Sequence, residues 1–308
     1  MIMTDVIIPT LRPTKELLDT FDILQRQTVP VHKIIIMDSE EVSFDRLFKE
    51  CGYHIDESVI EVHHIEKSQF DHGGTRNQGV RYSDADIFIC MTQDAVPADE
   101  HFIEALTAPL TDESVIASYA RQLPKPGCSP EETFTRQFNY PDVSVVKSES
   151  DLDRLGIKTY FCSNVSCAYR RDVFDKLGGF IDKTIFNEDM VYAGKAVKAG
   201  YKIAYAADAK VYHSHDYTAK EQFRRNVDIG ISQAEHPEVF AGLKSESEGK
   251  KLVLKTVKEL REGGYALRVP GYLWTIVARY AGFKIGTNYR KLPKGFIRKV
   301  SMNPGYFD

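Results

Sequence analysis

The chain has 308 residues, of which 43% are hydrophobic and 27% charged, and its net charge at pH 7 is −4. This slight acidity argues against a dedicated nucleic-acid-binding protein, and five cysteines without a CxxC pair fit neither a disulfide framework nor a zinc site. No stretch reaches the roughly 18 apolar residues that a membrane-spanning helix requires, so we expect a cytoplasmic protein.

Short apolar runs alternate with helical patterns over the first 120 residues. The helical patterns cover 14–27, 43–51 and 74–82, and the apolar runs typical of buried strands lie at 5–9, 33–38, 59–65 and 86–91. This alternation predicts βαβ units and a Rossmann-like α/β fold, with a mainly parallel sheet flanked by helices. Ligands of such sheets bind outside the carboxyl ends of the strands. Polar side chains follow three of the predicted strands there: Thr10, Arg12, Asp38, Gln93 and Asp94.

The second half of the chain changes from strands to helices. Further strands are predicted near 160–169 and 202–206, and the clearest later helices cover 220–233 and 248–262. We therefore expect an α/β domain over residues 1–217 and a C-terminal helical extension over residues 218–308.

The C-terminal extension is basic, with 13 Lys or Arg against 3 Asp or Glu over residues 250–308. Between residues 268 and 299 these cations alternate with aromatic and aliphatic side chains. Such a segment suits a helix in the headgroup region of a membrane, but it also suits packing on the main domain or a dimer interface. A nucleic-acid role for the extension is opposed by the acidity of the rest of the chain.

Two segments carry residue types that bind metals. Asp94 directly follows an apolar strand, where a carboxylate can hold Mg²⁺ or Mn²⁺, although alone it is more typical of a turn or helix cap. His213 and His215 point the same way on an extended segment, so both can reach one site. His63 and His64 lie inside a predicted strand, and we interpret them as structural.

Two further segments precede predicted helices. The run FDHGGTRNQG (70–79) has two glycines that allow close approach of a ligand, a helix start that favours anions, and Arg76, which suits phosphate. An ordinary Gly-rich turn is the alternative, since the run is neither GxGxxG nor a P-loop. Glu188 and Asp189 could supply a base to an incoming hydroxyl, although the helix dipole alone also favours acidic residues there.

Together these segments resemble glycosyltransferase family 2, which has the GT-A fold. The resemblance covers about 4–217 and includes the opening IIPTLRP, Asp38, the run SNVSCAYRR (163–171), the acidic pair and the later histidines. FDHGGTRNQG looks especially like a run of the rhamnosyltransferase subgroup. The usual Asp-x-Asp metal motif is reduced here to Thr92-Gln93-Asp94, so one carboxylate remains.

The resemblance implies a role for each candidate residue. Asp189 would be the catalytic base, with Glu188 as the second candidate. Asp94 would bind Mg²⁺ or Mn²⁺, with His213 and His215 as further ligands, and Ser163 and Asn164 would lie on the acceptor side. The residues that would bind the nucleotide and diphosphate of the donor are Pro9, Thr10, Arg12, Asp38, Gly73, Arg76, Asn77 and Gln93.

The implied reaction is inverting transfer of L-rhamnose from dTDP-L-rhamnose to a hydroxyl of a growing bacterial surface polysaccharide or lipid-linked glycan. The alternatives are transfer from another donor such as a UDP-hexose, a nucleotidyltransferase, and a non-catalytic nucleotide-sugar-binding subunit. Nucleotidyltransferases usually have a Gly-rich loop near the N-terminus, and IIPTLRP lacks those glycines. Peripheral contact with the inner face of the membrane and a homodimer both stay open.

Overall fold

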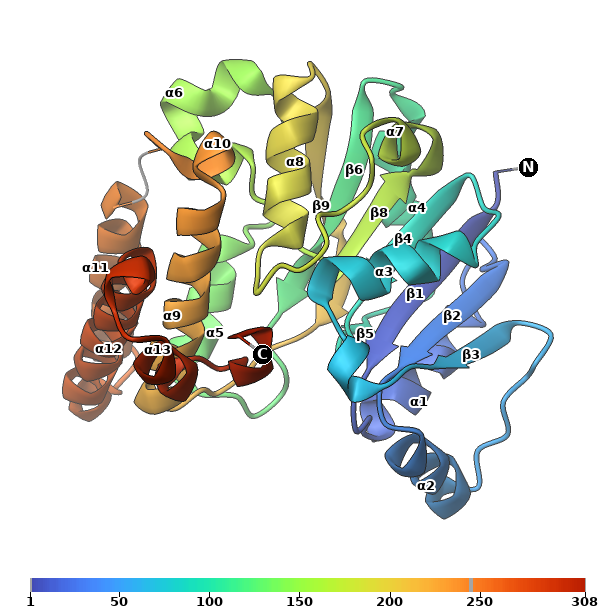
Figure 1. Ribbon diagram of the computed structural model, residues 1–308, viewed down its shortest axis with the longest axis horizontal. Coiled ribbons are helices and arrows are strands. Elements are labelled where there is room, and N and C mark those ends of the chain that lie inside the picture. The colour runs from blue at the N-terminus through green and yellow to red at the C-terminus, as the bar shows by residue number, and fades with distance from the viewer. Residues whose placement is uncertain (1, 244–245, 308) are drawn as a thin grey trace.

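A nine-stranded sheet forms the centre of the computed structural model, which describes residues 2–243 and 246–307 (Figure 1). The strand order is β3–β2–β1–β4–β8–β6–β9–β5, and β7 pairs with β9. The strands are β1 (Thr4–Thr10), β2 (Lys33–Asp38), β3 (Ile60–His64), β4 (Ile87–Met91), β5 (Val96–Pro97), β6 (Val115–Leu123), β7 (Val145–Lys147), β8 (Ser166–Arg170) and β9 (Lys202–Tyr212).

The two halves of the sheet differ in strand direction. Strands β1 to β4 are parallel, as predicted, and β6 is parallel to β9. Strand β8 lies antiparallel between β4 and β6, and β5 and β7 are antiparallel to β9, so the whole sheet is mixed. The predicted strand at 160–169 begins only at Ser166. The preceding backbone turns so that the carbonyl oxygens of Lys158 and Phe161 accept hydrogen bonds from the buried Lys147 ammonium group.

Helices cover both faces of the sheet because successive residues of its central strands are apolar and point alternately to the two faces. Val6, Ile8, Ile34 and Ile36 face one core, which also contains residues of α1, α2 and α4, whereas Ile7 faces a second core with α3, α7 and α8. The helices of this part are α1 (Lys15–Leu24), α2 (Glu41–Cys51), α3 (His72–Arg81), α4 (Phe102–Thr107), α5 (Pro130–Asn139), α6 (Leu152–Leu155), α7 (Arg171–Lys176) and α8 (Glu188–Lys198).

The C-terminal region is helical, as predicted, and lies beside one end of the sheet (Figure 1). A β-carbon at Gly230, Gly282 or Gly286 would collide with the backbone of the facing helix. These glycines therefore let α9 and α12 cross with their backbones in direct contact. The helices of the region are α9 (Ala219–Glu235), α10 (Pro237–Phe240), α11 (Glu246–Glu262), α12 (Val269–Thr287) and α13 (Lys294–Val300).

Helix α12 has one covered face and one exposed face. Tyr272 is buried, whereas Leu273, Trp274, Val277 and Tyr280 are 42%, 66%, 56% and 59% exposed and form a stripe that we call the outer stripe of α12. Within the described residues, α12 and the other helices fall short of the length and apolarity needed to cross a membrane.

Candidate active site

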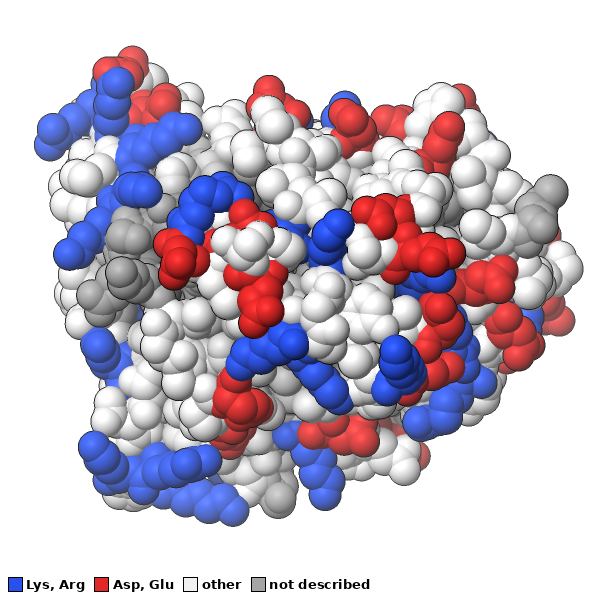
Figure 2. Space-filling model, turned by 90° about the horizontal axis from the view of Figure 1, so that it is seen from above, with Lys and Arg blue, Asp and Glu red and all other residues white. Residues whose placement is uncertain are grey.

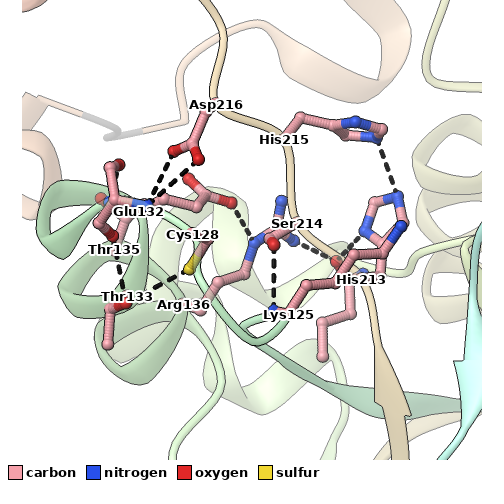
Figure 3. Close-up of polar contacts among 12 residues, drawn as sticks. Lys125, Cys128, Glu132, Thr133, Thr135, Arg136, His213, Ser214, His215 and Asp216 are labelled. Carbon is pink, nitrogen blue, oxygen red and sulfur yellow. Dashed lines mark hydrogen bonds and ion pairs between the residues drawn. The ribbon is translucent and has the colours of Figure 1, made fainter.

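Asp94 and two histidines meet at one edge of the sheet. Asp94 follows β4, and His213 and His215 follow β9, so the strands bring together residues about 120 positions apart. The Nε2 atom of His215 lies 3.1 Å from His213 Nε2 (Figure 3). Asp94 Oδ2 lies 3.1 Å from His215 Nε2 and 3.6 Å from His213 Nε2. These three side chains can each offer one ligand atom to a metal ion, all within 4.8 Å of one another. The structure thus places the three predicted metal ligands together.

Gln122 on β6 fixes the orientation of His213. Its Oε1 atom lies 3.0 Å from His213 Nδ1 and also accepts a hydrogen bond from Arg136. A carbonyl oxygen can only accept, so Nδ1 carries the proton and the Nε2 lone pair faces Asp94. Burial lowers the pKa of His213 to about 3, which keeps the ring neutral. A neutral imidazole with its far nitrogen anchored is the usual arrangement of a metal-binding histidine.

The turn that carries the acidic pair is held by the C-terminal region. Asn187 adopts the left-handed backbone conformation, with φ of 63°, immediately before α8. Its side-chain amide donates to the hydroxyl of Ser232 on α9, and that hydroxyl donates to the carbonyl oxygen of Phe186. Ile185 packs in an apolar cluster with Val227 and other residues of α9 to α13. Helix α9 therefore stabilises the turn that orients Glu188 and Asp189.

Glu188 and Asp189 are adjacent but have different surroundings. Glu188 is buried and forms an ion pair with Arg76 at 3.2 Å and a hydrogen bond with Asn164 Nδ2 at 3.0 Å. Burial would raise the pKa of Glu188, but Arg76, His72 and Asn164 more than offset it, and the pKa lies below its ordinary value. Asp189 is only partly buried and has no such cation. Burial and the Glu188 charge raise its pKa to about 7.

A cavity of about 1190 Å³ connects these groups. Asp94, Asp189 and both histidines lie on its wall, and helices α5, α9 and α12 form the opposite side. Aromatic side chains such as Tyr119, Tyr140 and Phe161 line its interior, which suits the apolar faces of sugar rings. The cavity is large enough for a substrate of several rings, since ordinary ligand sites measure about 300–1,000 Å³.

Comparison with known protein families shows where the chain belongs. The model of the family described as "Glycosyl transferase family 2" matches residues 5–178, more than half of the chain. The chain belongs to glycosyl transferase family 2.

Relatives of this family 2 glycosyltransferase extend over nearly its whole length. It is 38% identical over 307 residues to the O-antigen chain rhamnosyltransferase RfbN of Salmonella typhimurium, covering 98% of this chain and 95% of that protein. It is 35% identical over 292 residues to the O-antigen chain rhamnosyltransferase WbaN of Salmonella anatum, covering 94% and 90%. The predicted resemblance to the rhamnosyltransferase subgroup is thereby confirmed.

Solved structures confirm the GT-A fold. The mannosyltransferase PcManGT from Pyrobaculum calidifontis, in complex with GDP-Man and Mn²⁺, superimposes with a TM-score of 0.61 at 14% identity, over 93% of this chain and 87% of that one. Residues 1–349 of S. aureus TarS, in complex with UDP-GlcNAc, give a TM-score of 0.52 at 14% identity, over 98% and 84%.

The residues predicted to bind the nucleotide of the donor include Asp38 and two residues beside it. Pro9 and Thr10 end β1, and the Thr10 hydroxyl donates to Asp38 Oδ1 at 2.8 Å. Asp38 Oδ2 lies 3.0 Å from His64 Nδ1 and accepts from the backbone of Glu40. His64 thus contacts a predicted donor residue, and this contact is compatible with the structural role that we expect for it. His63 stacks on Tyr82, as a structural residue would.

Two other predicted donor residues hold neighbouring protein groups. Gln93 accepts from the backbone nitrogen of Leu11 and donates to its carbonyl oxygen, at 2.9 and 3.0 Å. Arg12 is exposed and forms a bidentate contact with Glu40. Gln93 therefore fixes the loop after β1, and Arg12 stands at the surface of that loop.

Most of the glycine-rich run forms α3, and it packs there against the segment 180–182. Gly73 packs against the carbonyl oxygen of Ile181, and the Asn77 amide exchanges hydrogen bonds with the backbone of Phe180. Neither residue lies on the cavity wall, and their contact with the donor stays a prediction. Arg76 does reach the wall, but it is paired with Glu188. The run thus braces the segment that leads to the turn with Glu188 and Asp189, and this packing requires the same small residues as the approach of a ligand would.

The predicted acceptor-side residues lie on the cavity wall. The backbone nitrogen of Asn164 donates to Asp189 Oδ2 at 2.9 Å, and the Ser163 hydroxyl accepts from Gln122 Nε2 at 3.0 Å. Gln122 and Arg136 were not predicted. Arg136 donates a hydrogen bond to Gln122. It also donates one to Glu132 on α5 (Figure 3). The apolar run that forms β6 was the available signal, because Gln122 stands near its carboxyl end.

Proposed function

We propose that this glycosyltransferase moves L-rhamnose from dTDP-L-rhamnose to a hydroxyl group of a growing bacterial surface polysaccharide, with inversion at the anomeric carbon. One observation carries the proposal: a partly buried carboxylate with a raised pKa, Asp189, shares a cavity with the Asp94–histidine cluster. The two rhamnosyltransferase relatives support the choice of sugar and of product.

Asp189 is suited to act as the catalytic base. Its two oxygens accept backbone hydrogen bonds from Asn164 and Met190, which fix the carboxylate and leave lone pairs free for an acceptor hydroxyl. As that hydroxyl oxygen attacks the anomeric carbon, its proton passes to Asp189, and the bond between that carbon and the diphosphate breaks with the electron pair leaving on the diphosphate. A pKa near 7 gives a base that is ionised at neutral pH yet basic enough to take the proton. Glu188 is less suited because Arg76 and Asn164 already occupy it.

We propose that Asp94, His213 and His215 hold a divalent cation. A carboxylate with two neutral imidazoles is a donor set for a divalent metal, and the nitrogen ligands favour Mn²⁺ over Mg²⁺, which prefers oxygen. When bound, such an ion supplies positive charge to the departing diphosphate. The protein side chains supply the remaining functions: the Thr10–Asp38–His64 group would receive the nucleotide base, and Ser163 and Asn164 would face the acceptor.

The donor is testable by its effect on thermal unfolding. In a panel of nucleotide sugars with Mn²⁺, dTDP-L-rhamnose is expected to give the largest rise in Tm, because a ligand at 100 times its Kd adds about 2.7 kcal/mol to the free energy of unfolding. The measurement is differential scanning fluorimetry with dTDP, UDP-glucose and GDP-mannose as matched controls. A larger rise with a UDP-hexose would assign the enzyme to another donor and leave the family unchanged.

We further propose that residues 1–217 act as the catalytic domain and that the region 218–308 contacts the inner face of an anionic membrane. The outer stripe of α12 exposes Trp274 and Tyr280, and Lys284 lies 5.3 Å from the Tyr280 ring. Figure 2 shows Lys and Arg side chains gathered at the end of the molecule formed by the C-terminal helices. Exposed aromatic residues next to cations fit lipid headgroups, where each cation contributes about 1 kcal/mol.

Vesicle co-sedimentation tests this contact. The intact protein is expected to sediment with phosphatidylglycerol vesicles at low salt and to stay in solution with phosphatidylcholine vesicles. Trp274→Ser should weaken sedimentation about tenfold, and Val42→Ser, which alters another exposed apolar side chain on α2, should have no effect. A protein that never sediments, or a Trp274→Ser variant that turns a dimer into a monomer, would contradict membrane contact.

A further inference from the structure

Two arginines of the C-terminal helices face the cavity without a carboxylate partner. Arg225 on α9 and Arg279 on α12 both lie on its wall. Among the described residues, neither has a carboxylate oxygen within 4.0 Å. Arg225 instead lies over the rings of Phe186 and Tyr217, at 4.6 and 5.7 Å. Burial, together with the charge of Arg225, lowers the pKa of Arg279.

Each of three carboxylates on this side of the cavity has a partner other than Arg225 or Arg279. Glu131 forms an ion pair with Arg268 at 2.7 Å, and Glu132 forms one with Arg136 at 2.6 Å (Figure 3). Asp216 accepts two hydrogen bonds from the backbone nitrogen of Ser129. Two guanidinium charges are therefore left in a partly desolvated wall, an arrangement that is costly unless an anion binds.

We infer that Arg225 and Arg279 form a binding site for a phosphate or diphosphate group of the acceptor substrate. This inference rests on the proposed function, since it names a part of the acceptor. Guanidinium groups match the geometry of phosphate oxygens, and two of them around one cavity can share a diphosphate. The acceptor would then be a glycan that ends in a phosphorylated carrier rather than a neutral oligosaccharide.

The position of α12 assigns this anion to the acceptor rather than to the donor. The donor diphosphate would have its own source of positive charge in the cation that we propose at Asp94, His213 and His215. Arg279 lies on the helix whose other face is the outer stripe. A carrier with a hydrophobic tail could place its phosphate at Arg279 and its tail along that stripe, while its glycan extends through the aromatic part of the cavity toward Asp189.

Binding of inorganic pyrophosphate to the full-length protein tests the site without any enzymatic reaction. Calorimetry in EDTA removes metal-bound pyrophosphate from the measurement. We expect Arg225→Gln and Arg279→Gln each to raise the Kd at least tenfold, and Arg279→Lys to restore most of the affinity. Arg268→Gln is the matched control, because its cation lies on the same wall but is already paired, and its Kd should change less than twofold.

A second measurement separates the acceptor from the donor. Saturating dTDP should leave pyrophosphate affinity unchanged if the two anions occupy different sites. Complete displacement by dTDP would overturn the inference and assign the arginines to the donor. Equal loss of affinity in Arg268→Gln, or no pyrophosphate binding by the wild type, would also overturn it. If pyrophosphate binds as expected but no sugar is transferred from any donor, the proposed function fails and the anion site stands.

Discussion

Asp94→Asn is expected to lower sugar transfer by roughly 10³-fold, because a bound metal contributes several kcal/mol to the leaving of the diphosphate and each 1.4 kcal/mol is a factor of ten. Asn keeps the shape of the side chain but removes the charge that faces His213 and His215. EDTA should have the same effect on the wild type, and Mn²⁺ should restore activity. The measurements are initial rates of transfer and titration of the metal-free protein with Mn²⁺ by calorimetry.

Two variants serve as controls for the metal site. Gln122→Ala leaves the three ligands in place but removes the acceptor of the His213 Nδ1–H group, so the ring loses its fixed orientation. We therefore expect metal affinity to fall about 10- to 100-fold. Asp112→Asn removes an exposed carboxylate far from the cavity and should change nothing. Full activity of the EDTA-treated enzyme, with no metal detected by elemental analysis, would show that Asp94 has another role.

Asp189→Asn is expected to lower kcat by roughly 10²–10⁴-fold, the usual contribution of a general base, with the affinity for the donor nearly unchanged. In the wild type, kcat/KM should fall about tenfold per pH unit below a pKa near 7, because only the ionised carboxylate accepts the proton. The folded-state pKa lies above the unfolded value, so the protonated form stabilises the fold, and this contribution to the free energy of unfolding is lost as the pH rises through 7. Asp189→Asn should abolish both pH dependences.

Glu188→Gln distinguishes the base from its neighbour. It leaves the buried Arg76 without a counter-charge, and the loss of one partner of a buried pair costs about 3–5 kcal/mol of stability. We therefore expect a lower Tm for Glu188→Gln and a near-normal Tm for Asp189→Asn. If Glu188→Gln folds normally but is inactive while Asp189→Asn retains activity, the two roles must be exchanged.

The N-terminal half of the fold could be predicted from sequence because its strands are buried on both faces. Such strands read as uninterrupted apolar runs, and the polar residue after each run marks the edge where ligands bind. That rule found Asp38 and Asp94. The spacing of His213 and His215 then predicted that both would face the same partner, and the structure confirms that they lie against Asp94.

The parts that could not be predicted depend on contacts between distant segments. The direction of β8 is set by its pairing with β4 and β6, which no local pattern encodes. The glycines of the FDHGGTRNQG run were expected to admit a ligand. In the structure Gly73 admits the backbone of Ile181 and Gly74 faces the side chains of Asp71 and Asp182, and a sequence cannot distinguish such packing from the approach of a ligand. The surroundings of Arg225 and Arg279 likewise depend on how α9 and α12 pack beside the turn with Glu188 and Asp189, which no local pattern encodes.

The glycine contacts between α9 and α12 limit how this enzyme can change its substrate range. Gly230, Gly282 and Gly286 leave no space for a side chain, so α9 and α12 cannot move closer to each other. A larger residue at the crossing would separate the two helices and, with them, Arg225 and Arg279. Helix α5, which also lines the cavity, has no fully buried residue and joins the cluster of Leu260, Val269 and Tyr272 through the partly buried Phe134, so it can shift at a smaller cost than α9 or α12. Adaptation to a wider or differently branched glycan should therefore arise through α5, while Arg225 and Arg279 keep their spacing.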